Sequence, residues 1–275
     1  MAKPPAAPKP SAASRAVARA LRASLLVDRA AVWFDRLRSK LVVTLASDAV
    51  LDAYNAIAYG SSASYNPETD AFRRDWFPWE RSALDAWFPA APARVLVGGA
   101  GGGREALLLA QAGYEVTAFE PVLPLVRAFA DAARGTCQVF VGRYETLPAV
   151  IRLDGTAAEL AGDSFDAGIM GWGSVAHVRR DEARVEAVRA FARLVRGPVL
   201  VSVYPELWRP GKGRLDRWLS TDGAVFSPGL GRVQTYDEAR LRDLLERAGV
   251  EILAIDTSSR IDNWPHAVVR ASTGS

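Results

Sequence analysis

Cysteine and histidine are scarce in this 275-residue chain, which has one cysteine, Cys137, and two histidines, His177 and His266. A single cysteine excludes a disulfide within the chain and a zinc site built from several cysteines, and two histidines exclude a histidine-rich metal site. We therefore expect no bound metal, and a reducing cytoplasm suits the chain best. No run of about 18 uncharged apolar residues occurs, so no integral membrane segment is expected.

Lysine is also scarce, with 4 residues against 30 arginines, a bias typical of a GC-rich bacterial coding sequence. Residues 1–40 carry a net charge of +7 and residues 41–275 carry −4, so the basic character belongs to the N-terminal segment. The acidic remainder has no basic face for nucleic acid, and no nucleic-acid partner is expected. The first 27 residues lack acids, as organelle transit peptides do, but we favour a solvated basic helix.

The N-terminal third of the chain contains two kinds of segment. Residues 1–13 are rich in Pro and Ala and are expected to form a disordered tail. Residues 14–90 are expected to form a helical cap, in which apolar residues with helical spacing predict one helix over residues 14–48. The rest of this cap is rich in aromatic residues: Tyr54, Tyr59, Tyr65, Phe72, Trp76, Phe77, Trp79, Trp87 and Phe88.

Residues 91–275 alternate between short apolar runs and amphipathic segments. This alternation predicts an α/β fold with a mostly parallel sheet of seven strands, covered by helices on both faces. No helix separates the last two strands, so the last strand is expected to be antiparallel. The predicted strands are residues 94–98, 115–119, 138–141, 165–170, 198–203, 250–255 and 267–271, and the predicted helices are 104–112, 123–134, 181–195 and 236–248.

The strongest local signal is a glycine loop between the first predicted strand and the helix that follows it. Five of the six residues 98–103 are glycine. A ligand that crosses such a turn needs backbone without Cβ atoms and the free N–H groups of a helix N-terminus. Glu120 ends the second strand, 21 residues after Gly99, where a carboxylate can accept both hydroxyl hydrogens of a ribose. The loop and Glu120 together favour a nucleoside-containing ligand over a turn without a ligand.

The spacing of the glycines separates two kinds of cofactor site. The dinucleotide pattern G-x-G-x-x-G fails, because Arg104 takes the place of its last glycine. The pattern G-x-G-x-G fits at Gly99, Gly101 and Gly103, and over residues 94–271 the chain resembles the class I S-adenosylmethionine-dependent methyltransferases. The resemblance implies a Rossmann-like methyltransferase fold that binds S-adenosylmethionine. The implied contacts are Gly99, Ala100, Gly101 and Gly103 beneath the methionine part, and Glu120 and Pro121 at the ribose.

Two positions depart from the family pattern. The acid that often ends the first strand is replaced by Val97, and the acid that often follows the third strand is replaced by Arg143. Arg143 is kept as a cofactor contact, and recognition of the adenine is expected from the backbone around Tyr144, with Tyr144 or Glu145 beside it.

The end of the fourth strand is the candidate reaction centre. In the resembled family, this segment flanks the transferred methyl group, which assigns Met170, Gly171 and Trp172 to the cofactor site. His177 is the candidate general base, because an imidazole titrates near neutral pH, although a surface or helix-capping role is the alternative. Tyr65 of the cap is the second candidate catalytic residue, with simple packing as its alternative. His266 precedes an edge strand and is interpreted as structural.

Other features narrow the reaction type. The segment after the fourth strand lacks the Asn/Asp-Pro-Pro-Tyr motif of methyltransferases that act on amino groups of DNA bases, and it lacks the acidic cluster of cation-dependent enzymes.

Residues 206–235 are expected to be a long loop, either a substrate-covering segment or a surface insertion.

The sequence thus predicts a metal-independent methyltransferase that acts on oxygen or nitrogen of a small organic molecule. A protein or peptide methyltransferase and a non-catalytic S-adenosylmethionine-binding protein are the alternatives. The oligomeric state and the substrate are not specified by the sequence.

Overall fold

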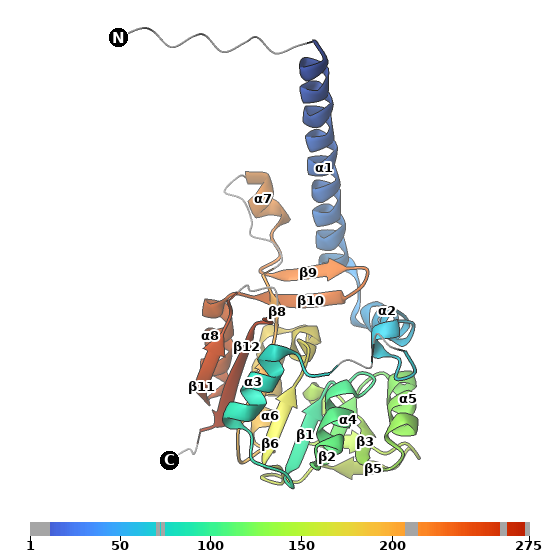
Figure 1. Ribbon diagram of the computed structural model, residues 1–275, viewed down its shortest axis with the longest axis vertical. Helices are drawn as coiled ribbons and strands as arrows, with labels where there is room; N and C mark the ends of the chain where they lie inside the picture. The colour runs from blue at the N-terminus through green and yellow to red at the C-terminus, as the bar shows by residue number, and fades with distance from the viewer. Residues whose placement is uncertain (1–11, 70–71, 73–74, 207–213, 259–262, 273–275) are drawn as a thin grey trace, which may run out of the picture.

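The computed structural model describes residues 12–69, 72, 75–206, 214–258 and 263–272. Its centre is a nine-stranded sheet with the strand order β11-β12-β7-β6-β1-β2-β3-β4-β5 (Figure 1). Five neighbouring strands run parallel, and β12 pairs antiparallel with both β7 and β11. The strands are β1 (Arg94–Gly98), β2 (Glu115–Glu120), β3 (Cys137–Val141), β4 (Ala149–Ile151), β5 (Ala157–Glu159), β6 (Ala167–Met170), β7 (Val199–Ser202), β11 (Val250–Asp256) and β12 (His266–Ala271).

Both faces of the sheet are covered because its central strands are apolar on both sides. Along β1, Leu96 packs into one core cluster while Val95 and Val97 pack into the other, as the alternation of side chains along a strand requires. The first cluster includes α6 (Asp181–Ala192) and α8 (Glu238–Ala248), and the second includes α3 (Pro78–Trp87), α4 (Arg104–Gln111) and α5 (Leu123–Ala133). The predicted α/β class, the mostly parallel sheet and the antiparallel last strand are confirmed.

The prediction of seven strands was too low, because β4 and β5 extend the sheet as a short antiparallel hairpin. Each strand has only three residues, too few for an alternating pattern to be recognised. A turn signal was nevertheless present at Asp154-Gly155, where Gly155 has φ +87° and the side chain of Asp154 accepts a bond from the N–H of Thr156.

The prediction of a long loop over residues 206–235 was wrong. The segment contains α7 (Arg214–Leu219), β9 (Ala224–Ser227) and β10 (Gly231–Tyr236), and β10 pairs with both β9 and β8 (Tyr204–Pro205). The helix predicted from residue 236 begins at Glu238, because Asp237 is its N-cap and accepts a bond from the N–H of Arg240.

Two long helices begin the N-terminal cap. Most of the predicted tail lies outside the described residues, and α1 (Ala12–Leu45) begins two residues earlier than predicted. Ser47 then caps a second helix, α2 (Asp48–Gly60), so the single helix predicted over residues 14–48 was wrong at its end. The base of α1 packs on the small sheet, where the N–H of Phe226 donates to Ser39 Oγ at 2.8 Å, and the rest of α1 projects away (Figure 1).

The two remaining cap elements lie nearer the central sheet. After α2 comes a single 3₁₀ turn, η1 (Ala63–Tyr65), and α3 then packs directly on the central sheet. The boundary at residue 90 between the cap and the α/β domain stays a prediction. No helix among the described residues is long and apolar enough to cross a membrane.

Candidate functional site

A cavity of about 600 Å³ lies at the carboxyl ends of β1, β2 and β6, the edge where ligands of open α/β sheets bind. The glycine loop, the segments that follow β2, β3 and β6, and one side of α2 form its wall. The wall brings together most of the predicted site residues: Tyr65, Gly99, Gly101, Glu120, Pro121, Arg143, Tyr144, Glu145, Gly171, Trp172 and His177. Three others, Ala100, Gly103 and Met170, do not line it.

Left-handed backbone shapes the glycine loop. Gly99, Gly101 and Gly103 have φ values of +60°, +56° and +91°, a region that side chains with a Cβ rarely adopt. A Cβ on Gly103 would lie 2.2 Å from the ring of Phe129, so this glycine allows α4 to pack closely on α5. A Cβ on Gly101 would lie 2.7 Å from the ring of Tyr65 at the cavity wall. Gly103 therefore serves packing, and Gly101 keeps the wall free of a side chain.

Glu120 is a buried carboxylate fixed by backbone donors. Its Oε2 accepts a bond from the N–H of Gly101 and its Oε1 accepts one from the N–H of Val122, each at 3.0 Å. Burial raises the pKa of Glu120 to about 7, against the lowering effect of these two bonds. Since a carboxylate oxygen accepts more than one bond, each oxygen keeps acceptor capacity for a ligand hydroxyl.

The segment after β3 supplies the opposite wall. Tyr144 is buried, its ring packs against Phe119, and its hydroxyl lies 2.7 Å from Ser174 Oγ. Arg143, which replaces the expected acid, points instead toward α2 and pairs with Asp52 at 3.1 Å. Glu145 lies on the wall and is exposed.

The end of β6 separates core residues from wall residues. Met170 is fully buried among apolar side chains, whereas Gly171 and Trp172 face the cavity. Trp172 has φ +48°, and its indole N–H donates to Glu80 Oε1 of α3 at 3.1 Å. A cap helix thus holds a residue of the wall, a contact that the sequence did not predict.

His177 is held by a tyrosine that the sequence analysis did not assign to the site. The Tyr59 hydroxyl lies 2.9 Å from His177 Nε2 and 2.8 Å from the carbonyl oxygen of Leu230, to which it donates. Burial lowers the pKa of His177 to about 4, so the imidazole is neutral at physiological pH. The ring of Tyr59 also meets that of Tyr65 edge to face, with centroids 5.0 Å apart, and burial raises the pKa of both tyrosines.

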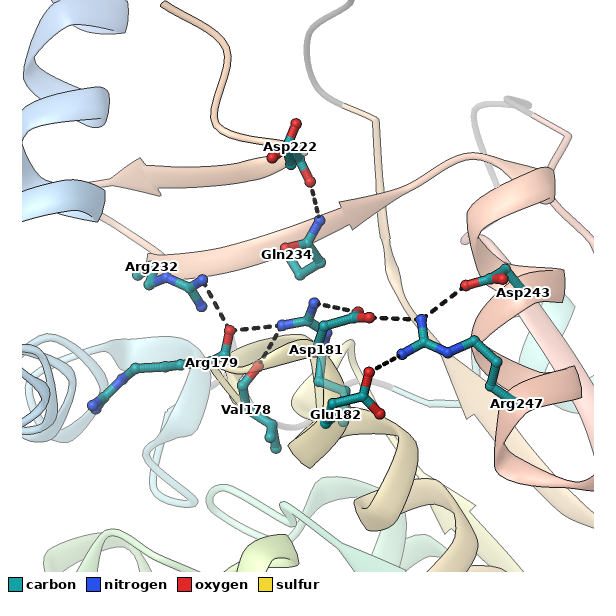
Figure 2. A network of polar contacts seen from close by, with 10 residues as sticks. Val178, Arg179, Asp181, Glu182, Asp222, Arg232, Gln234, Asp243 and Arg247 are labelled. Atoms are coloured by element: carbon teal, nitrogen blue, oxygen red, sulfur yellow. Dashed lines mark hydrogen bonds and ion pairs between the residues drawn. The ribbon is translucent and has the colours of Figure 1, made fainter.

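A polar network holds the backbone of Val178 and Arg179, the two residues that follow His177 (Figure 2). Arg184 of α6 donates to the carbonyl oxygens of Val178 and Arg179, at 3.0 and 2.8 Å. Arg232 of β10 donates to the carbonyl oxygen of Arg179 at 3.1 Å. Arg247 of α8 completes the network by pairing with Asp181, Glu182 and Asp243.

The mouth of the cavity is closed on one side by ion pairs to α2. Arg179 pairs with Asp48 at 2.6 Å and also with Asp52, which in turn pairs with Arg143. The two acids stand four residues apart, on one face of the helix. That spacing was visible in the sequence, but the partners lie about a hundred residues away and carry no local signal.

The other histidine has no place in this cavity. His266 packs against Trp79 with ring centroids 5.0 Å apart, and its Nδ1 lies 2.7 Å from the carbonyl oxygen of Trp264. Among the described residues, no group of three or more His, Cys, Asp or Glu side chains is arranged to hold a metal ion.

Comparison with known proteins relates this architecture to solved structures. No family model matches the chain, and no curated protein matches it. A methyltransferase named CcbJ from Streptomyces caelestis is 18% identical, with a TM-score of 0.55, over 78% of this chain and 98% of that one. An S-adenosylmethionine-dependent methyltransferase from Methanosarcina mazei is 19% identical, with a TM-score of 0.52, over 71% and 96% of the two chains.

A third solved structure contains bound ligands. The 1,6-didemethyltoxoflavin-N1-methyltransferase of Burkholderia thailandensis, with 1,6-didemethyltoxoflavin and S-adenosylhomocysteine bound, is 20% identical. Its TM-score is 0.54, and the likeness covers 82% of this chain and 89% of that one. The chain therefore has the Rossmann-like fold of S-adenosylmethionine-dependent methyltransferases, which confirms the fold that the glycine loop and the terminal strands implied.

Proposed function

We propose that the protein is an S-adenosylmethionine-dependent methyltransferase. The observation that carries the proposal is the buried carboxylate of Glu120, which is fixed by the N–H of Gly101 in the wall of the cavity. A ribose is the ligand group whose two adjacent hydroxyls match the free acceptor capacity of its two oxygens.

The residues present fit this cofactor. In the wall of the cavity, Gly99 and Gly101 would leave room for the methionine part, Glu120 and Pro121 would hold the ribose, and Tyr144 and Glu145 would border the adenine. A volume of about 600 Å³ suits a ligand of this size. The bound cofactor would supply a methyl group on a sulfonium, from which transfer needs mainly in-line approach and exclusion of water.

The protein's own residues would shape the site of the accepting atom. Trp172 and His177 line the wall beyond the glycine loop, and Tyr65 covers Gly101 from the cap. We keep His177 and Tyr65 as candidate catalytic residues. Because the Tyr59 hydroxyl donates to Leu230, the neutral imidazole of His177 donates its Nε2–H to Tyr59, so proton removal by His177 would fall to Nδ1 or require the other tautomer.

We infer a small organic molecule as the substrate, methylated at oxygen or nitrogen without a metal, in the cytoplasm. The partly enclosed cavity supports a small substrate, because α2 and Tyr65 restrict access to it. One observation favours a protein or peptide substrate instead: α1 carries exposed apolar residues, including Leu21, Leu26 and Phe34, beside several arginines. Removal of residues 1–31 would abolish activity on a protein and spare activity on a small molecule.

Equilibrium dialysis against radiolabelled S-adenosylmethionine tests the proposal. We expect saturable binding at one site per chain, displaced by S-adenosylhomocysteine and not by NAD. Displacement by NAD alone, or the absence of saturable binding, would overturn the assignment.

A further inference from the structure

A buried cluster of polar side chains connects the cap to the glycine loop and to the wall of the cavity. Its centre is Glu80 of α3, whose side chain is 2% exposed and pairs with the guanidinium of Arg104. Arg104 also contacts Glu105 at 3.3 Å and donates to the carbonyl oxygen of Asp75 at 3.2 Å. Arg104 is the residue that replaces the last glycine of the dinucleotide pattern, and its side chain binds Glu80 and Asp75 of the cap.

The same carboxylate holds Trp172. Glu80 Oε1 accepts the indole N–H of Trp172 at 3.1 Å, and Oε2 accepts the N–H of Phe77 at 2.9 Å. The guanidinium of Arg104 lies over two rings that also contact each other, 5.0 Å from the centroid of Phe77 and 5.4 Å from that of Trp172. Trp264 packs on the indole as well, with centroids 5.7 Å apart. The indole is therefore fixed at its N–H and along its ring.

The backbone of Trp172 makes this support necessary. Its φ of +48° is in the left-handed region, which is strained for a residue with a Cβ. Such strain persists where the surroundings hold the residue in place, and it gathers at functional sites. Here the strained residue lines the cavity between Gly171 and Gly173.

We propose that Glu80 is a positioning residue, which holds the indole of Trp172 in the cavity wall where the accepting molecule would lie. This role rests on the proposed function, since it assigns the Trp172 wall to the substrate side of a methyl-transfer site. Glu80 acts through Trp172 and makes no contact with the cavity itself, because it is absent from the wall.

The hydrogen-bond acceptor, rather than the negative charge, is the property of Glu80 that matters. Two carboxylates, Glu80 and Glu105, face the single guanidinium of Arg104, and burial together with Glu105 raises the pKa of Glu80. Glutamine at this position keeps a carbonyl oxygen for Trp172 and Arg104. Methionine keeps the approximate shape and loses the acceptor.

Fluorine NMR of protein labelled with fluorotryptophan tests the role, with the Trp172 resonance assigned from Trp172→Phe. We expect Glu80→Gln to leave this resonance in place and Glu80→Met to split it or broaden it at least about twofold. Trp218, on α7 and 53% exposed, is the internal control and should be unchanged in both variants. An unchanged Trp172 resonance in Glu80→Met, or equal changes at Trp172 and Trp218, would overturn the role.

A second measurement decides the question if Glu80→Met does not fold. In the proton spectrum of Glu80→Gln, the indole N–H signal of Trp172 should move more than any other indole N–H signal, because its acceptor changes from a carboxylate to an amide, while the fluorine signal of the ring stays in place. No change there would overturn the contact. Titration with S-adenosylhomocysteine separates the two proposals. Failure of the native protein to bind it refutes the proposed function, whereas intact binding with an unchanged Trp172 resonance in Glu80→Met refutes only the positioning role.

Discussion

Replacement of Glu120 by glutamine should remove most of the affinity for the cofactor while the fold is retained. Glutamine offers one acceptor oxygen in place of two, and its amide group must face the N–H of either Gly101 or Val122. Glutamine can therefore accept from one ribose hydroxyl and not from both, and a hydrogen bond to a charged group contributes about 1.5–3 kcal/mol. The dissociation constant for S-adenosylhomocysteine should therefore rise at least about 10-fold.

Calorimetric titration of native protein, Glu120→Gln and Glu115→Gln measures this effect. Glu115 is the matched control, because it is an exposed carboxylate on the same strand as Glu120 and lies outside the cavity wall, and its variant should bind within about twofold of native. A loss of less than about threefold in Glu120→Gln would refute the assignment of Glu120 to the ribose.

The pH dependence of the same titration tests the charge on Glu120. With a pKa of about 7 in the free protein, the carboxyl is protonated at lower pH and must lose its proton to accept two hydroxyls. Affinity should therefore rise as the pH increases toward about 7, by up to about tenfold per unit, and level off above it. Glu120→Gln should show no such rise, and stronger native binding at low pH would contradict this mechanism.

Three further predictions concern packing, titration and the cap. Gly103→Ala should lower the free energy of unfolding by about 2 kcal/mol or more in urea titrations, because φ is +91° and Phe129 fills the space; an unchanged midpoint would contradict this. His177 should titrate by NMR near its pKa of about 4, and a midpoint near 6.5 would refute its burial. Because folding lowers this pKa, the free energy of unfolding should fall by up to about 3 kcal/mol as the pH drops from about 6.5 toward 4. Tyr65→Ala should speed the dissociation of S-adenosylhomocysteine about tenfold in stopped-flow measurements, because the ring that lies against Gly101 is lost. Tyr65→Phe keeps the ring and should change the rate less than about twofold. Equal rates in both variants would show that the ring does not cover the bound ligand.

The parts of the site that the sequence predicted are those encoded within short segments. The glycine loop after β1, Glu120 at the end of β2 and Trp172 after β6 occupy places that strand ends determine. A local pattern was sufficient there, because the carboxyl ends of parallel strands meet at one edge of the sheet. Met170 was assigned to the site from the same reasoning, yet its side chain points into the core.

The parts that the sequence did not predict depend on contacts between distant segments. Tyr59 reaches His177 across 118 residues and Glu80 reaches Trp172 across 92, and no periodicity in either segment indicates such a partner. The neutral state of His177 follows from that burial, so a base with an ordinary pKa was the expectation that the sequence alone supported.

Direct binding by the native protein tests the central claim, by isothermal titration with S-adenosylhomocysteine and, separately, with NADH. We predict micromolar affinity for S-adenosylhomocysteine and no measurable heat with NADH. Binding of NADH instead, or of neither compound, would contradict the assignment of this cavity to S-adenosylmethionine.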